Sequence, residues 1–139
     1  MARTRYLADT SVFAHLTRPR VAAAFAPLVA EARVALCAPV TFELGYAARG
    51  ALDYRDLMER LSAFPGAPTT DSDHRRALEI QSALDGRGQR RALSLVDGLV
   101  AAIAEARQLV VLHYDADFEL VAEVTGQAQE WIVPRGTAG

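Results

Sequence analysis

Lysine is absent from the sequence, and all 15 of its basic residues are arginines. A Walker-type phosphate loop needs its lysine, and a Schiff-base enzyme needs a lysine amine, so both kinds of site are excluded. Cysteine is limited to Cys37, which excludes an intrachain disulfide and a zinc cluster built on cysteines. Because Cys37 lies within the apolar stretch VALCAP, we expect a buried structural thiol rather than a nucleophile.

Long hydrophobic runs are also missing. Charged residues interrupt every apolar stretch well before the roughly 20 residues that span a bilayer. Arg3 and Arg5 lead directly into a short strand-like segment rather than into the apolar part of a signal peptide. These features predict a cytoplasmic protein that does not enter a membrane. Positive charge is not in excess either: the net charge is −2, so any contact with nucleic acid must come from local arginine clusters.

The 139 residues, of which 51% are hydrophobic and 23% charged, have the size and composition of one globular domain. Strand-like segments alternate with helical patterns, which predicts an α/β fold: a single three-layer domain with a mainly parallel central sheet of four to five strands flanked by helices. We expect this domain to occupy residues 1–134 and residues 135–139 to form a disordered tail. Strands are predicted at 4–8, 34–38, 66–70, 110–114 and 130–133, and helical segments at 11–17, 20–32, 39–50, 53–64, 71–84 (with Asp71 as its cap), 92–107 and 115–124.

Asp97 is the clearest anomaly, because it lies in the predicted helix 92–107, which is apolar nearly all round and should be buried. An unpaired carboxylate there would cost several kcal/mol or would take up a proton. A charged partner such as Arg107, a solvent cleft or a cation would each make Asp97 tolerable. The adjacent Gly98 lowers helix propensity by roughly 1 kcal/mol, which suggests close approach of another element.

Further acidic residues follow predicted strands. Asp9 ends the first strand and Asp115 ends the segment VVLHY, so both are expected at the edge of the sheet where parallel α/β proteins bind ligands. Each of them alone is just as typical of a helix cap. Glu43 has apolar neighbours in the helix 39–50, a pattern that also suits a surface glutamate. Asp117 could reach a cation through water or cap the helix that contains Phe118.

A cluster of such acids points to a hard metal ion. Carboxylates forced together repel one another unless a cation compensates, and oxygen-only ligands suit Mg²⁺ or Mn²⁺ rather than zinc or copper. The three histidines, at positions 15, 74 and 113, show no i, i+4 pairing, and we expect His113 to be structural or at the rim of the site. A magnesium site of acids fits phosphodiester hydrolysis, because the metal activates water and neutralises charge on the phosphate.

Four short motifs occur in a fixed order: LADTSV, TFELGYAAR, SLVDGLVAAIAEA and VVLHYDADFELVAE. Their order and spacing resemble the PIN domain and, more narrowly, the VapC-type toxins of bacterial toxin–antitoxin pairs, from Tyr6 to Val133. The resemblance implies a PIN-like fold, Mg²⁺- or Mn²⁺-dependent endoribonuclease activity and a homodimer. It also implies inhibition by a cognate antitoxin whose tail enters the active groove.

Position by position, the resemblance assigns the catalytic and metal-binding acids to Asp9, Glu43, Asp97 and Asp115. Asp117 matches the second acid of the D-x-D-F motif and is expected as a secondary ligand. RNA binding is expected from small polar or basic residues near these acids. The candidates are Thr10, Ser11, Arg18, Arg20, Arg49, Arg87, Arg90 and Arg91, of which the last three lie within five residues of one polar loop.

Three alternatives stay open at this point. A magnesium phosphohydrolase could act on another phosphate ester, although its covalent version needs the lysine that the chain lacks. Receiver domains and haloacid-dehalogenase-like phosphatases share the acidic α/β layout and depend on a lysine in the same way. A non-catalytic PIN-like module could keep the fold only to bind a partner protein, but it would have no need of a buried Asp97. A structure-specific DNA nuclease would need additional elements for duplex DNA, for which the chain has no room.

Overall fold

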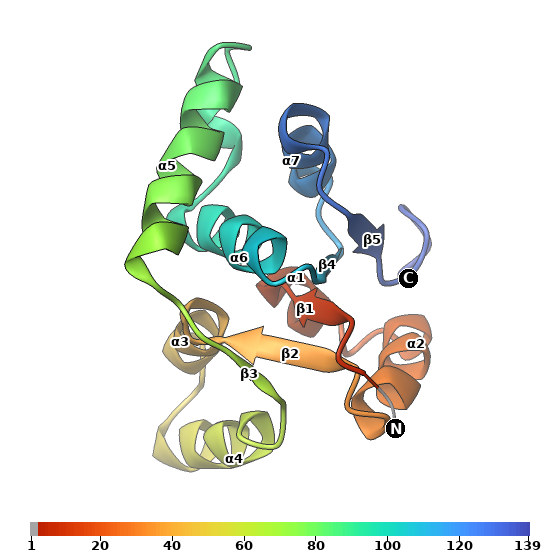
Figure 1. The fold of residues 1–139 in the computed structure, drawn as a ribbon. Coiled ribbons are helices and arrows are strands. Elements are labelled where there is room, and N and C mark those ends of the chain that lie inside the picture. The colour runs from red at the N-terminus through yellow and green to blue at the C-terminus, as the bar shows by residue number, and fades with distance from the viewer. Residues whose placement is uncertain (1–2) are drawn as a thin grey trace.

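A five-stranded parallel sheet runs through the structure, a computed structural model that describes residues 3–139 (Figure 1). Its strands are ordered β3-β2-β1-β4-β5, with β1 at the centre. They are β1 (Tyr6–Ala8), β2 (Val34–Cys37), β3 (Gly66–Ala67), β4 (Val110–His113) and β5 (Gln129–Trp131). The predicted α/β architecture with a mainly parallel sheet is therefore confirmed, and the fifth strand is present.

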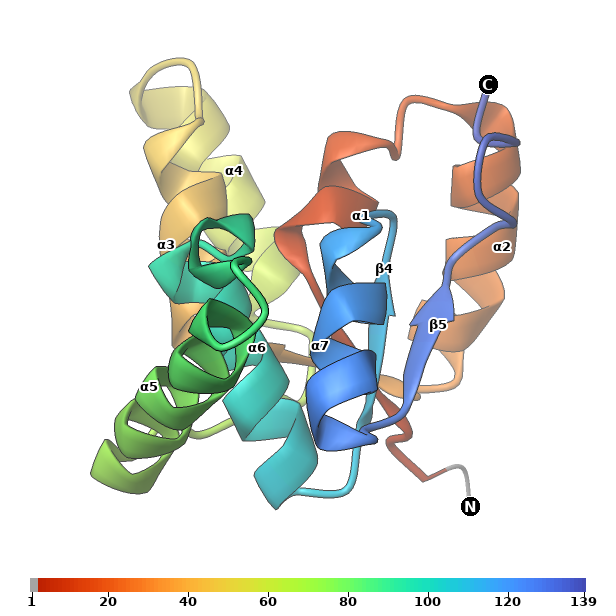
Figure 2. The same ribbon diagram turned by 90° about the horizontal axis from the view of Figure 1, so that it is seen from above.

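Seven α-helices connect these strands, as parallel pairing requires. They are α1 (Thr10–Ala14), α2 (Pro19–Ala30), α3 (Ala38–Tyr46), α4 (Ala51–Leu61), α5 (Asp71–Asp85), α6 (Leu95–Ala106) and α7 (Asp117–Thr125), with a 3₁₀ turn at Arg90–Ala92. In Figures 1 and 2, α2 and α6 lie on opposite sides of the sheet, which gives the three layers predicted from the sequence. Within residues 3–139, no helix has the length and apolar character needed to cross a membrane.

The core is formed by the central strands and by α6. All residues of β1 and β2 are buried, as continuous apolar strands covered on both faces should be. In α6, the seven consecutive residues 98–104 are buried, and the helix packs against β1 and β4. Cys37 is 1% exposed at the end of β2, which confirms the expected buried thiol, and burial raises the pKa of this thiol to about 11.

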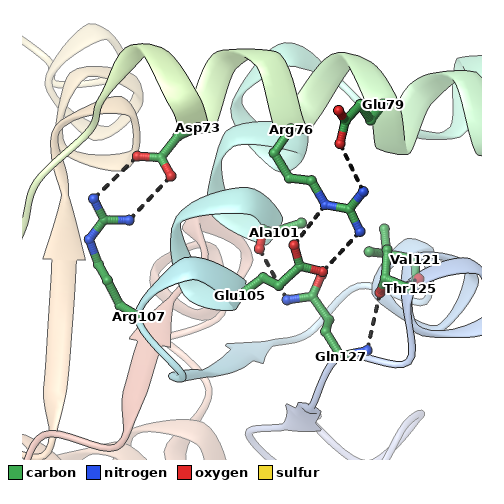
Figure 3. Close-up of polar contacts among 9 residues, drawn as sticks. All are labelled: Asp73, Arg76, Glu79, Ala101, Glu105, Arg107, Val121, Thr125 and Gln127. Carbon is green, nitrogen blue, oxygen red and sulfur yellow. Dashed lines mark hydrogen bonds and ion pairs between the residues drawn. The ribbon is translucent and has the colours of Figure 1, made fainter.

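Ion pairs between charged side chains hold α5 against α6 (Figure 3). The guanidinium of Arg107, just beyond α6, donates to both carboxylate oxygens of Asp73 on α5, at 3.3 and 3.2 Å. A second arginine of α5, Arg76, donates to both oxygens of Glu105 on α6, at 2.7 and 3.1 Å. Arg107 was considered as a partner for Asp97, but the structure pairs it with Asp73 instead.

Capping residues define where α5 and α6 begin. Thr70, rather than the predicted Asp71, is the N-cap of α5, because its hydroxyl accepts from the backbone N–H of Asp73 and the Asp73 carboxylate accepts from that of Thr70. Ser94 caps α6 in the same way, so this helix begins at Leu95 instead of residue 92. The later start places Asp97 in the first turn of α6 rather than in its interior.

Helices α3 and α4 form an arm beside the end of the sheet. They approach so closely at Gly45 that a Cβ atom there would lie 2.9 Å from Met58 Cε. Between the arm, β2 and β3 lies an apolar groove of about 870 Å³, and the aromatic rings of Phe42 and Tyr46 stand exposed beside it. Exposed apolar surface of this kind is a feature of interaction sites.

The C-terminal residues lie against the domain. The backbone N–H groups of Gly136 and Ala138 donate to the phenolic oxygen of Tyr114, at 2.9 and 3.3 Å, and Ala138 is 5% exposed. The disordered tail predicted at 135–139 stays a prediction beside these contacts. The domain boundary at residue 134 stays a prediction.

Candidate functional site

Three carboxylates converge at the carboxyl ends of β1 and β4. Asp9 follows β1, Asp115 lies two residues beyond β4, and the first turn of α6 brings Asp97 to the same place. One oxygen of each residue lies within 4.8 Å of the others. The chain adds β2 and β3 on one side of β1 and β4 and β5 on the other, so the strand order reverses at β1, and α/β proteins bind ligands at such a switch point.

Asp9 is the most buried of the three acids, with 2% of its surface exposed. It caps α1: its Oδ2 accepts a hydrogen bond from the backbone N–H of Ser11 at 3.0 Å. Its Oδ1 is buried and has no hydrogen-bond partner in the part of the chain that the structure describes. A buried carboxylate oxygen left unpaired is costly, so a ligand at this atom would remove a penalty.

Asp97 takes part in a capping box at the start of α6. The Ser94 hydroxyl accepts from the backbone N–H of Asp97 at 3.1 Å, and Asp97 Oδ2 accepts from the backbone N–H of Ser94 at 3.5 Å. The second bond is too long to hold the carboxylate strongly. Asp97 therefore has a local structural role, but this role leaves it close to Asp9 and Asp115 with little compensation for its charge.

Asp115 is held by the backbone that follows β4. Its Oδ1 accepts from the backbone N–H of Asp117 at 3.0 Å, a turn that leads into α7. Ser11 joins the two strand ends, because its hydroxyl accepts from the backbone N–H of Tyr114 at 2.9 Å while its own N–H donates to Asp9. The predicted site residue Ser11 thus acts as a bridge within the acidic cluster.

The charges of the cluster oppose one another. Burial and, after it, the nearby charges of Asp9 and Asp115 together raise the pKa of Asp97 to about 7, while the hydrogen bonds from Ser94 oppose this rise. Burial likewise raises the pKa of Asp9, with Asp115 adding to the effect. Burial and the adjacent Asp115 raise the pKa of Asp117 as well. Without a cation, the folded protein therefore favours a partly protonated cluster.

Glu43 lies next to this cluster without being part of it. Its Oε1 accepts a 2.5 Å hydrogen bond from the hydroxyl of Thr10, the residue after Asp9. The three-residue group that could hold an ion contains neither Glu43 nor Asp117. Thr10 therefore links Glu43 on α3 to the start of α1, and the predicted role of each of these residues stays a prediction.

The predicted RNA-binding arginines lie on several exposed surfaces. In the loop after α5, Arg87 pairs with Glu123 of α7 at 3.3 Å and Arg90 pairs with Asp85 at 3.0 Å. Their charges are therefore partly neutralised, whereas Arg91 forms no ion pair with any residue in the range 3–139. The others, Arg18, Arg20 and Arg49, are exposed, and Arg49 follows the helix that carries Glu43.

The donor set fits a divalent cation of the Mg²⁺ class. Three carboxylates offer oxygen atoms within 4.8 Å of one another, and one of these residues, Asp9, has a buried oxygen without a partner. No arginine in the described part of the chain pairs with Asp9, Asp97 or Asp115, so no side chain supplies the missing positive charge. Oxygen ligands without sulfur or imidazole favour Mg²⁺ or Mn²⁺.

Two residues at this edge of the sheet were not identified as site residues from the sequence. His113, the last residue of β4, is fully buried rather than at the rim, and burial lowers the pKa of its imidazole. Its Nδ1 is 3.1 Å from the backbone nitrogen of Asp115 and its Nε2 is 2.5 Å from the side-chain oxygen of Gln129 on β5. The only signal in the sequence was the position of His113 two residues before Asp115.

Comparison with known proteins gives consistent matches. Residues 6–124 match the PIN domain. The chain is 50% identical over 133 residues to Ribonuclease VapC51 of Mycobacterium tuberculosis, covering 96% of each chain. It is 39% identical over 136 residues to Ribonuclease VapC21 of the same organism, covering 97% of this chain and 99% of the relative.

Solved structures share the fold. A VapBC complex from Salmonella typhimurium bound to DNA contains a chain that superposes with a TM-score of 0.72 at 19% identity, covering 94% of this chain and 99% of that one. FitAcB from Neisseria gonorrhoeae gives a TM-score of 0.68 at 25% identity, covering 89% and 95%. Each of these matches spans most of this chain and most of the chain with which it is compared. The chain belongs to the PIN-domain family and, within it, to the VapC group.

Proposed function

We propose that this protein is a divalent-metal-dependent endoribonuclease that hydrolyses RNA phosphodiester bonds as the toxin of a toxin–antitoxin pair. The observation that carries the proposal is the uncompensated cluster of Asp9, Asp97 and Asp115, whose oxygens lie within 4.8 Å of one another. The relatives named as VapC ribonucleases support RNA as the substrate. The structures of VapBC complexes support an antitoxin as the protein partner.

Each acid has a distinct part in this proposal. Asp9, Asp97 and Asp115 hold Mg²⁺ or Mn²⁺, and Asp117 supports the cluster as a secondary ligand next to Asp115. When bound, the cation activates water for attack and neutralises the charge that develops on the scissile phosphate. In this proposal Glu43, whose Oε1 accepts from the Thr10 hydroxyl, would orient the attacking water and accept its proton.

RNA binding needs positive charge, which the acidic cluster itself lacks. Two exposed arginines, Arg91 before α6 and Arg49 beyond the helix that carries Glu43, would contact the phosphates of a single strand of RNA. The homodimer and the cytoplasmic location that the sequence predicts belong to the same proposal.

The proposal is tested by incubating a mixed RNA pool with the purified protein in Mg²⁺, in Mn²⁺ and in EDTA. We expect cleavage with either metal, none in EDTA, and none with the Asp97→Asn variant in any condition. Asp53→Asn, which changes an exposed acid in the first turn of α4, is the matched control and should cleave like the parent. Cleavage by Asp97→Asn at the parental rate would refute the metal-site proposal. Metal binding without cleavage of any RNA would favour a non-catalytic, partner-binding module.

A further inference from the structure

Two hydrogen bonds form a side-chain relay from Gln129 on β5, through the imidazole of His113, to the backbone of Asp115, the proposed metal ligand beyond β4. The imidazole of His113 lies between two polar groups: Gln129 Oε1 is 2.5 Å from its Nε2, and the backbone nitrogen of Asp115 is 3.1 Å from its Nδ1. His113 is fully buried, so water cannot replace either contact at low cost. The two contacts therefore determine together where the ring places its single proton.

The backbone N–H of Asp115 fixes the direction of this relay. It can only donate, so the 3.1 Å contact forms only in the tautomer whose Nδ1 carries no proton and accepts. In the neutral ring the proton then resides on Nε2, which donates to Gln129 Oε1. The opposite arrangement would turn a backbone N–H and a ring N–H toward each other, with no acceptor between them.

Packing holds the ring in the plane that this relay needs. The imidazole centroid lies 5.1 Å from the ring of Phe118 on α7 and 5.0 Å from that of Trp131 on β5. The parallel pairing of β4 with β5 sets Trp131 opposite His113, and Gln129 two residues earlier on the same face. Gln129 and Trp131 thus reach His113 together from one strand.

We propose that His113 and Gln129 are positioning residues for Asp115, with Gln129 fixing the Nε2–H tautomer of His113 so that Nδ1 anchors the backbone of Asp115. This inference rests on the proposed role of Asp115 as a metal ligand. Neither residue belongs to the group of acids that would hold the metal. Outer residues that orient a ligand in this way commonly change metal affinity by about 10–100-fold when they are replaced.

Gln129 is the residue to change, because it is only partly buried and its replacement leaves the ring of His113 in place. Gln129→Leu removes the acceptor, whereas Gln129→Glu keeps an oxygen that accepts from Nε2–H. Gln127→Leu is the matched control. Gln127 is a partly buried glutamine two residues earlier, and its side chain donates to the carbonyl of Ala101 at 3.1 Å, away from His113.

The first experiment measures Mn²⁺ affinity of the purified proteins by electron paramagnetic resonance, beside their melting temperatures in EDTA. Gln129→Leu is expected to bind Mn²⁺ about tenfold more weakly than the parent. Gln129→Glu is expected to stay within about threefold of the parent, and Gln127→Leu to lower the melting temperature without changing the affinity. Parental affinity in Gln129→Leu would overturn the positioning role. Absence of Mn²⁺ binding in the parent would instead refute the proposed metal site.

The second experiment reads the tautomer directly from the ¹⁵N shifts of the His113 ring at about pH 7.5. The parent and Gln129→Glu should show a protonated Nε2 and an unprotonated Nδ1. In Gln129→Leu, the ring should lose this fixed state and show a mixture of tautomers. A protonated Nδ1 in the parent would contradict the relay, whatever the affinities are.

Discussion

Arg107 forms a two-bond ion pair with Asp73 of α5, at 3.3 and 3.2 Å, and not with Asp97 at the other end of α6. Burial alone would raise the pKa of Asp73, but the bonds from Arg107 and Thr70 outweigh it and hold this pKa below its ordinary value. The guanidinium of Arg107, at the end of α6, therefore compensates the charge of an acid on α5 and not that of Asp97. Asp97 is left beside Asp9 and Asp115 without a guanidinium partner, so a bound cation would supply the positive charge that these three acids lack.

Arg107→Met should lower the free energy of unfolding by about 3 kcal/mol, because it leaves the buried Asp73 carboxylate without its partner. Urea denaturation measures the effect. Arg60→Met is the matched control, since Arg60 pairs with Asp56 on the surface of α4, and it should change stability by less than about 0.5 kcal/mol. Mn²⁺ affinity of folded Arg107→Met should equal that of the parent. A large loss of affinity would mean that Arg107 acts on the acidic site after all.

The metal-free protein should lose stability as the pH rises from about 5 to about 8. The folded pKa of Asp97, about 7, lies above the value near 3.9 of an unfolded chain, so the folded state binds a proton that the unfolded state has released. Asp9 acts in the same direction, whereas the lowered pKa of His113 opposes the decline up to about pH 6.5, because the unfolded state binds that proton more strongly. The lowered pKa of Asp73 has the opposite effect, but only below its ordinary value of 3.8.

Melting temperatures in EDTA at several pH values test this expectation. The decline should be shallower in Asp97→Asn and unchanged in Asp53→Asn. Saturating Mn²⁺ should remove or reverse the decline in the parent, because the metal binds the deprotonated acids. Equal pH profiles for the parent and Asp97→Asn would show that Asp97 does not titrate in this range.

Thr10→Val should reduce kcat for RNA cleavage about tenfold while leaving KM and Mn²⁺ affinity close to the parental values. The hydroxyl contacts Glu43 and none of the three clustered acids, so its loss disturbs the orientation of Glu43 alone. Thr17→Val, at an exposed position after α1, is the control. A raised KM with an unchanged kcat would instead identify Thr10 as an RNA contact, as the sequence suggested.

Arg91→Ala should weaken binding of single-stranded RNA and reduce the slope of log affinity against log salt by about 0.7. Arg87→Ala and Arg90→Ala should have smaller effects, because Glu123 and Asp85 already compete for these guanidinium groups. Fluorescence anisotropy in the Asp97→Asn background measures binding without cleavage. If none of the three variants changes the slope, the RNA does not pass along this loop.

The sequence was sufficient to predict the architecture because its strands are short, apolar and separated by strong helix signals. It also placed Asp9 and Asp115 at one edge of the sheet, since each follows a strand whose direction the parallel topology fixes. The helix around Asp97 was predicted with its start three residues too early. The alternation of apolar residues continues across Ser94, and only the capping geometry shows where the helix begins.

What the sequence could not supply were contacts between distant segments. The pairs Arg107–Asp73 and Thr10–Glu43 join residues 34 and 33 positions apart, and no local rule chooses such partners. His113 and Gln129 meet only because β4 and β5 pair in one particular register. The ion pair of Arg87 in the loop after α5 could not be predicted for the same reason, because its partner Glu123 lies on α7.

Mn²⁺ binding to the purified protein tests the central claim most directly, because it examines the site without requiring the correct RNA. The account predicts saturable binding in the parent and in Asp53→Asn, and at least about tenfold weaker binding in Asp97→Asn, which retains the fold and the capping geometry of α6. Equal binding by the parent and Asp97→Asn would contradict the claim that Asp9, Asp97 and Asp115 together hold the metal.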